Sequence, residues 1–474
     1  MRWLPLVALA ACSSTTSSNG IDSGLDAKQF VDARSDGTPR PDAYAPRACD
    51  APLTFADGFV PTRIIHVTAG AIYGDGSLEF PFGSIAAAAA AATPGTFIQV
   101  AVAPNGTQHG TNQFIANLHG TPDAPIVIGG IWGTLPEIVG GSEGLHLTDP
   151  RWVVIQNLHF SNQAANAINI DDGVSYSGTA GPVAIVNVVA HDVQDGAGAC
   201  IRAAGVANLY VYNSRLLRCS TGIDAIGVHD SVIARDELGR TTQSAVRVRG
   251  GSHDVDIRQN TIVDGGTTGI SLGGYTQLAQ FRPALSTTSP NAEARNIRAF
   301  DNVITGQMTA AIAFDDCVDC LVAHNVVHGN PNMLLRILQN ATTQGSFTFE
   351  PTGNGRVINN SFNWSSINLL RHVEVGFGTS ASTFTFSHNL WNCADQPSQS
   401  QPSLPVTEDM PVIGIGTGYY PGPSGPYCGG PEAGKAAPLP EVDGTIEGYC
   451  RAAGDAPTIG PQMLQSGTVC GGGI

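Results

Sequence analysis

The stretch SAVRVRGGSHDVDIRQNTIVDGG, residues Ser244 to Gly266, decides the fold of this chain. It alternates apolar and polar residues as a β-strand does, breaks at a pair of glycines, and then alternates again. The same unit recurs along the middle of the sequence. Short strands with an apolar first and third residue begin at Leu145, Ile168, Ile201, Ile223, Val246, Ile270, Ile312, Leu335 and Leu370. A second kind of strand ends near Asn157, Asn187, Asn213, Arg235, Asn260, Asn302, Asn325, Asn360 and Asn389.

The two halves of this repeat differ in length. From each second marker to the next first marker the spacing is 10 to 14 residues, whereas from first to second marker it ranges from 12 to 32. A repeat of about 20–30 residues made of short strands predicts a solenoid, an all-β fold whose coils bury their apolar faces only by stacking on one another. Each coil is then one turn of a parallel β-helix. Eight of the nine second markers are Asn, which tolerates a left-handed backbone and bonds to a stacked Asn, so we expect an asparagine corner.

Composition limits the function. The chain has 474 residues with 57 Gly, 30 Pro and only 13% charged residues, as in a large, turn-rich β-protein. Its formal net charge of −16 argues against nucleic acid as a partner. The only lysines are Lys28 and Lys435, so cationic chemistry in the coils must come from Arg or His.

The N-terminus reads as an export signal over residues 1–11, with Arg2 followed by an apolar run too short to span a bilayer. Leu9 to Cys12 resemble the lipobox of bacterial lipoproteins, which implies a lipid on Cys12. We therefore expect an exported, membrane-anchored lipoprotein of the outer membrane or cell surface, attached to the membrane through this lipid alone. The alternative is an ordinary secretory signal with a chance Cys. Both interpretations export the chain, so its thiols can oxidise.

The rest of the chain divides into three parts. Residues 12–50 are polar and lack a sustained apolar period, which indicates a disordered tether. Residues 51–393 form the β-helix domain, and residues 394–474 an irregular Cys-containing tail or cap. GSIAAAAAAATPG, with Ser84 as N-cap, predicts a short N-terminal helix that covers the open end of the solenoid. Nine Cys remain after Cys12, and the CxxC of Cys317 and Cys320 suits a disulfide or two buried thiols better than zinc.

Two strings carry a family resemblance. GDGSLEFPFGSIAAAAAAATPGTFIQVA (residues 74–101) and NLHGTPDAPIVIGG (residues 117–130) resemble the opening of right-handed parallel β-helix proteins of the pectate-lyase-like superfamily, including bacterial β-helix lipoproteins. The second string is similar to the entry segment of the chondroitinase B and alginate lyase group. The resemblance implies a carbohydrate-facing groove, often with calcium-assisted β-elimination on a uronic acid polymer. This chain departs from it because the coils contain no Lys to act as base. The glycosidase branch also fits poorly, since no GHG or RIK element follows NIDDG.

Strand alternation assigns side chains to faces, because the residue between two inward apolar residues points outward. The outward row reads His146, Asn169, Arg202, Asp224, Arg247, Ser271, Ala313, Arg336 and Arg371. A neighbouring outward row carries Asp171, Arg249 and Asp315. Since stacked strands lie about 4.8 Å apart, Arg202, Asp224, Arg247 and Arg249 should form one charged patch, with Arg247 meeting Asp224.

The longest insertions, near residues 171–182, 274–295 and 339–355, leave the coils at one corner beside this patch. Long loops on a rigid scaffold often form binding sites, and we expect these to wall a cleft with Arg282 overhanging it. The alternative is that outward Arg and Asp form ordinary cross-strand pairs that keep the solenoid soluble.

Two functional hypotheses remain open. In the first, a monomeric chain binds an acidic polysaccharide and cleaves it by β-elimination. Arg247 is then the base or clamp, the substrate-binding residues are Arg202, Asp224, Arg249, Arg282 and Arg336, and Asp171 and Asp172 are Ca²⁺ ligands. In the second, the chain is a non-catalytic structural or interaction protein of the cell surface. We favour binding of a polysaccharide, with cleavage left open.

Overall fold

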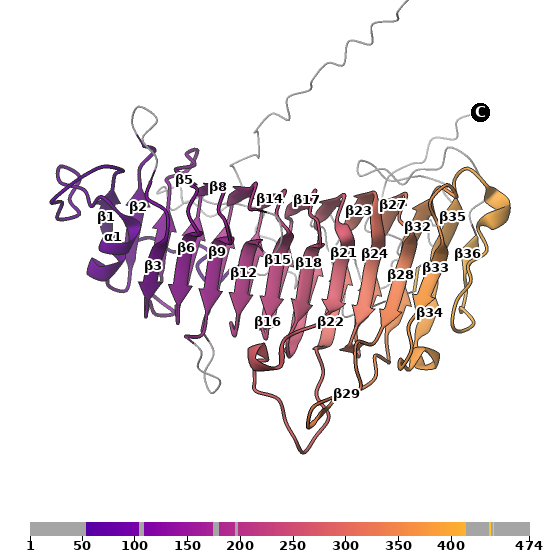
Figure 1. The fold of residues 1–474 in the computed structure, drawn as a ribbon. Coiled ribbons are helices and arrows are strands. Elements are labelled where there is room, and N and C mark those ends of the chain that lie inside the picture. Colours follow the sequence, from indigo (N-terminus) through magenta and orange to yellow (C-terminus); the bar gives the residue numbers. More distant parts are fainter. Residues whose placement is uncertain are drawn as a thin grey trace, which may run out of the picture. The chain divides into compact units, whose positions relative to one another are not determined.

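A computed structural model describes residues 54–103, 109–173, 180–194 and 198–413, together with 436, 437 and 439. The expected export signal, Cys12, the tether before residue 51, and Cys428, Cys450 and Cys470 lie outside these residues. Within them the chain winds into stacked coils that build three parallel sheets (Figure 1). The stretch from Ser244 to Gly266 is one coil, since β18, β19 and β20 fall within it and belong to three different sheets.

The ten-stranded sheet faces the viewer in Figure 1. In spatial order it contains β3 (Gln113–Ala116), β6 (Glu143–Thr148), β9 (Asn166–Asp171), β12 (Ala199–Ala204), β15 (Thr221–Ile226), β18 (Ser244–Arg249), β21 (Gly266–Gly273), β24 (Met308–Asp315), β28 (Met333–Leu338) and β33 (Arg371–Val375).

The thirteen-stranded sheet follows in each coil. It contains β1 (Arg63–Val67), β2 (Thr96–Val100), β4 (Ile126–Gly129), β7 (Val153–Gln156), β10 (Val183–Val186), β13 (Leu209–Tyr212), β16 (His229–Ala234), β19 (Ser252–Arg258), β22 (Ala294–Phe300), β26 (Leu321–Ala323), β31 (Arg356–Ile358) and β34 (Thr385–Ser387), with β25 (Cys317–Val318) paired to β22.

The eleven-stranded sheet closes each coil. It contains β5 (Glu137–Val139), β8 (His159–Ser161), β11 (Val189–His191), β14 (Arg215–Leu217), β17 (Glu237–Gly239), β20 (Thr261–Val263), β23 (Val303–Gly306), β27 (Val326–Gly329), β32 (Ser361–Trp364), β35 (Leu390–Cys393) and β36 (Val412–Ile413). Because β36 pairs with β35, this sheet continues past residue 393, where the sequence suggested that the coils end.

The core is a set of columns that run from coil to coil. Ile168, Ile201, Ile223, Val246, Ile270 and Ile312 are in register on consecutive strands and are fully buried. The all-β, parallel β-helix prediction is confirmed. The prediction for the last coil is wrong, because Val373 and not Leu370 continues the column. Leu370 is exposed, since residues inserted after β32 delay the start of β33.

The recurring asparagines occupy two adjacent positions of one corner, where the sequence suggested a single position. Asn157, Asn187, Asn213 and Arg235 have positive φ angles of 51° to 58° and turn the chain. From Asn260 on, the recurring Asn stands one position after the left-handed turn residue, and its side chain points inward and is buried. In each of the last five coils a different residue takes the left-handed turn: Gln259, Asp301, His324, Asn359 and His388.

One end of the stack is closed as the sequence predicts. Helix α1 (Ile85–Ala91) packs against the first coils, and the Ser84 hydroxyl accepts the N–H of Ala87 at 3.1 Å. Two disulfides join Cys200 to Cys219 and Cys317 to Cys320, which excludes zinc at the CxxC; Cys393 is the free cysteine among the described residues. No helix in these residues is long and apolar enough to cross a membrane.

Candidate functional site

The outward row of the ten-stranded sheet is the candidate site. Its register is the expected one from His146 through Asn169, Arg202, Asp224, Arg247, Ser271 and Ala313 to Arg336. The last member is different. Glu374 pairs with Arg336, and Arg371 lies three residues earlier, opposite Met333. The row therefore ends on an acid.

Asp224 joins the two arginines of the opening stretch. Its Oδ1 accepts Nε of Arg247 at 3.1 Å and Nε of Arg249 at 2.9 Å, and its Oδ2 accepts Nη2 of Arg249 at 2.9 Å. Burial alone would raise the pKa of Asp224, but the charges and hydrogen bonds of Arg247 and Arg249 lower it to about 2. The expected contact between Arg247 and Asp224 is thus present.

The two arginines, Arg247 and Arg249, differ in how much of the guanidinium is already bonded to protein groups. Arg249 is buried, and its Nη1 donates to the carbonyl of Tyr275 at 3.0 Å and the hydroxyl of Thr276 at 3.1 Å. It therefore ties the start of the long loop to the sheet. Arg247 keeps 23% of its side chain exposed, and its Nη1 reaches Gln243 only at 3.4 Å.

Arg202 lacks an ion pair among the described residues. Its Nη1 donates to Oδ1 of Asn169 at 3.1 Å, and the side chain is half-buried. A guanidinium has five donors, so most of those of Arg202 are open to a ligand.

His146 lies between two carboxylates. Its Nε2 is 2.6 Å from Oδ2 of Asp171, and its Nδ1 is 2.8 Å from Oε2 of Glu143. The hydrogen bond with Asp171, followed by that with Glu143, raises the pKa of His146 to about 9. Asn166 and Asn169 donate to Oε1 of the same glutamate at 2.8 and 2.9 Å. His146 is consequently an imidazolium at neutral pH, in contact through Asn169 with Arg202.

Asp171 and Asp172 point in different directions, as neighbours on a strand do. Asp171 faces His146, whereas the carboxylate of Asp172 is buried and accepts Nε of Arg282 at 2.7 Å. In the described part of the chain no group of three or more His, Cys, Asp or Glu side chains is arranged to hold a metal. These two carboxylates, each paired with a cation, do not fit a shared calcium site.

The long loop from Tyr275 to Glu293 lies along a corner of the coils. Gly227 there has φ +58°, and a Cβ on it would lie 2.2 Å from Cβ of Arg282, so the backbone must be glycine for the loop to dock. The carboxylate of Glu293 accepts the N–H groups of Gly250 and Thr276, each at 2.8 Å, and burial raises its pKa to about 7. The loop is held at its start, middle and end.

A second loop supports the first. It contains the hairpin of β29 (Thr343–Gln344) and β30 (Phe347–Thr348), and Phe349 packs on Phe281 with ring centroids 5.7 Å apart. In Figure 1 both loops extend beyond the lower ends of the ten-stranded sheet. They border the charged row at one edge, and Arg282 lies in the corner rather than over the patch. The third loop, at residues 174–179, lies outside the described residues.

The far end of the row has its own ion pair. Nε of Arg336 donates to Oε2 of Glu374 at 2.6 Å. Asp315 lies on the neighbouring row and accepts Nδ2 of Asn340 at 3.0 Å, and burial raises its pKa.

Glu143, His146 and Glu374 have no role in the hypotheses that the sequence suggests. The register already placed His146 one coil from Asp171, so the sequence could have predicted Asp171 as the partner of His146. The contact of Glu143 with His146 depends on how far the glutamate side chain reaches. The place of Glu374 in the row depends on the late start of β33. The spacing of residues in the sequence predicts neither.

A family model described as "Right handed beta helix region" matches residues 143–278. No curated protein matches the chain. The solved GH136 lacto-N-biosidase from Eubacterium ramulus is similar at 14% identity over 75% of this chain and 67% of that one, with a TM-score of 0.42. Pectate lyase Pel9A is similar at 13% identity over 86% and 97%, with a TM-score of 0.42.

A third structure is an alginate lyase from Paenibacillus sp. str. FPU-7, at 13% identity over 68% of this chain and 99% of that one, with a TM-score of 0.43. Parallel strands in three sheets, the buried columns and the family match lead to one conclusion: the chain is a right-handed parallel β-helix protein.

Proposed function

We propose that the chain binds an acidic polysaccharide along the outward row of the ten-stranded sheet. The observation that carries this proposal is the state of Arg202, a half-buried guanidinium without an ion-pair partner among the described residues. His146 and Arg247 lie two coils away on either side, which is about 10 Å at the usual strand spacing. Cations at a regular spacing suit a polymer with repeating carboxylates or sulfates.

The other arginines support this row in different ways. Arg247 and Arg336 each direct Nε to a carboxylate and keep part of the guanidinium exposed. Arg249 and Arg282 fix the long loop, so their part in binding is to position its backbone. Asp224 orients both Arg247 and Arg249.

We propose binding without cleavage. β-Elimination needs a base for the sugar proton, and an imidazolium with a pKa of about 9 is a poor base at neutral pH. Arg247, the base of the lyase hypothesis, donates Nε to Asp224, and a guanidinium has no acceptor atom for the sugar proton. A protein that binds no glycan and serves only as a surface scaffold is the competing function.

The test is a binding and cleavage assay on the chain from residue 50 onward, with a panel of uronate, sulfated and neutral polysaccharides. Arg202→Ala should weaken binding of the acidic glycan by at least about tenfold, since a charge-assisted contact contributes roughly 1.5–3 kcal/mol. Arg215→Ala, at a partly exposed arginine of the eleven-stranded sheet, is the matched control and should leave affinity unchanged.

Each remaining outcome decides between the hypotheses. A rise in absorbance from unsaturated products, abolished in Arg247→Ala, would establish the lyase in place of the binding protein. Equal affinity of the wild type, Arg202→Ala and Arg215→Ala chains, or no binding by any of them, would favour the scaffold.

We also propose that the protein is exported and lipid-anchored through Cys12. Two disulfides in the described residues support an oxidising compartment. Cys12→Ser should move the protein from the membrane fraction to the soluble exported fraction, as seen by fractionation and mass spectrometry of the N-terminus. Recovery of the wild type as a soluble chain without lipid would contradict this prediction.

A further inference from the structure

An apolar patch lies on the outer face of the thirteen-stranded sheet. Strand β26 reads Leu-Val-Ala, and all three residues are buried although successive side chains point to opposite faces. Val322 belongs to the main core, whereas Leu321 and Ala323 form a separate cluster with Phe300 of the neighbouring strand. A strand that is apolar on both faces is buried on both faces. Something must therefore cover this side of the sheet.

The described residues identify what first covers it. Leu439, which follows the last coil in sequence, packs against the cluster of Phe300, Leu321 and Ala323. Two residues earlier, Ala437 makes a reciprocal pair of hydrogen bonds with the side chain of Asn359: Nδ2 donates to its carbonyl and its N–H donates to Oδ1, both at 2.8 Å. The amide of Asn359 thus binds the backbone of this segment as a neighbouring strand would.

Charge favours the continuation of the same segment along this face. Residues 440–474 contain Glu441, Asp443, Glu447 and Asp455 against the single base Arg451. The outer face carries Arg258 next to Phe300 in register. Arg258 has no ion pair in the described residues, and burial lowers its pKa. The charges of Asp256 and Asp301 oppose this shift. An acidic segment that begins beside Leu439 would add further negative charge near Arg258.

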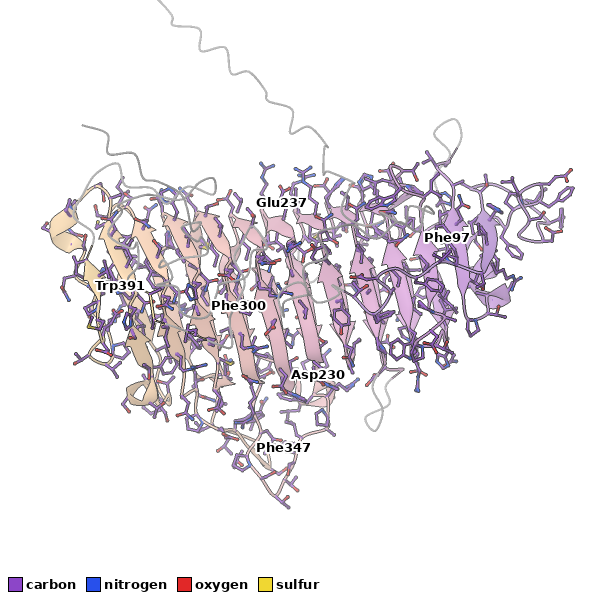
Figure 2. The ribbon with its side chains drawn as sticks, turned by 180° about the vertical axis from the view of Figure 1, so that it is seen from behind. Phe97, Asp230, Glu237, Phe300, Phe347 and Trp391 are labelled. Carbon is purple, nitrogen blue, oxygen red and sulfur yellow. A yellow bond between two sulfur atoms is a disulfide. The ribbon has the colours of Figure 1, made fainter. Side chains whose placement is uncertain are left out.

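We propose that residues 436–474 of this chain are the occupant of this face, with Leu439 seated on the Phe300 cluster and the acidic residues directed toward Arg258. The 35 residues after Leu439 extend to about 115 Å at most. This is far more than the single strand spacing between Phe300 and Arg258 requires. The terminal segment then shields an apolar surface that would otherwise drive self-association. Figure 2, the view from behind, labels Phe300 on this side of the coils.

The test places a photoreactive residue under the segment in the full chain. Phe300→p-benzoylphenylalanine should cross-link on irradiation to a peptide within residues 436–474, identified by mass spectrometry. Arg258→p-benzoylphenylalanine gives a second position if the first variant folds poorly. The matched control is the same substitution at Phe114, an exposed phenylalanine on the ten-stranded sheet, which should not reach this segment.

Two further variants test the contacts. Leu439→Ser should lower the cross-link yield severalfold, whereas Ile367→Ser, at an exposed apolar residue elsewhere, should leave it unchanged. Replacing Glu441, Asp443 and Glu447 by their amides should lower the yield from position 300, where Arg258 is present, more than from position 258, where the photoreactive residue has replaced it. Cross-links to residues before 54, to a second copy of the chain, or to nothing would overturn the proposal.

Discussion

Arg202 and Arg249 look alike in the sequence, since both point outward from strands of one sheet. The structure gives them different surroundings. Arg249 uses its donors on Asp224, Tyr275 and Thr276, whereas Arg202 uses one donor on Asn169. A guanidinium that is already satisfied stabilises the protein, and one with free donors is available to a ligand. This difference moves the centre of the proposed site from Arg247 toward Arg202.

The pKa of His146 gives a prediction about pH. It is about 9 in the folded protein against 6.5 in the unfolded chain, so folding binds a proton. The stabilisation is complete below pH 6.5 and is lost as pH rises toward 9. Thermal melts should therefore show a falling Tm over this range, and His146→Gln should flatten the curve. An NMR titration that finds His146 neutral at pH 7 would contradict the assignment.

Asp236 gives a second prediction. It occupies the inward corner position that is Asn from Asn260 on, and its Oδ1 accepts the N–H of Ser214 at 2.7 Å. Its Oδ2 is buried without a hydrogen bond, and burial raises the pKa well above 3.8. Because a raised carboxyl pKa costs stability as pH rises through and above 3.8, Asp236→Asn should stabilise the fold at pH 7 by roughly 1–3 kcal/mol.

Urea denaturation at pH 7 and at pH 4 checks this change. The gain should shrink at the lower pH, where the folded carboxyl group is protonated and the unfolded one, with its ordinary pKa of 3.8, is near its midpoint. Asp230→Asn at an exposed position is the control and should change stability little. Equal effects of the two substitutions, or a gain independent of pH, would contradict the prediction.

At the scale of the element, the asparagine corner is a hydrogen-bonded ladder. Nδ2 of Asn260, Asn302, Asn325 and Asn360 each donates to Oδ1 of the next Asn, at 2.9 to 3.0 Å. Each Oδ1 also accepts the backbone N–H of the preceding rung. Glu408 ends the ladder by accepting both groups from Asn389. Side-chain amides thus satisfy backbone groups that turn away from the sheets.

Asn325→Ala should break this ladder. The N–H and Nδ2 of Asn302 would lose Oδ1 as acceptor, and the carbonyl of Ala299 would lose its donor at 2.9 Å. Each buried group left unsatisfied costs about 1–3 kcal/mol, so urea denaturation should show a loss of several kcal/mol. Thr261→Ala, exposed on a nearby strand, should stay within about 0.5 kcal/mol of the wild type.

At the scale of the whole molecule, one loop spans several coils. The ion pair of Arg282 with Asp172 links residues 110 apart in sequence, and the loop crosses glycines at the corner between them. Arg282→Ala should release the loop, because it removes the guanidinium from a buried carboxylate. Breaking a buried pair costs up to about 3–5 kcal/mol.

Limited proteolysis followed by mass spectrometry tests this release. New cleavage should appear within residues 275–293 while the coils keep their circular dichroism. Arg215→Ala removes an exposed pair worth about 0–1 kcal/mol and is the control. An unchanged cleavage pattern in Arg282→Ala would mean that Arg249 and Glu293 hold the loop alone.

The sequence by itself determined the parallel β-helix, the capping helix and the faces of the strands. These follow from short-range rules: a strand alternates with period two, and a repeat fixes which residues stack. The inward column from Ile168 to Ile312 and the contact of Arg247 with Asp224 were readable for this reason. The rule failed at Leu370, because the residues inserted before β33 give no indication in the sequence of where that strand begins.

Only the tertiary structure decided which outward arginines keep donors that no protein group uses. Whether Arg249 or Arg202 has open donors depends on where a loop 26 residues away returns, as the contact of Arg249 with Tyr275 shows. The same holds for Arg282, whose partner Asp172 lies 110 residues earlier in the sequence, and for the contact of Leu439 with Phe300. Such contacts join segments that are far apart in sequence, and tertiary packing fixes their geometry. No local pattern of residues in the sequence predicts that packing.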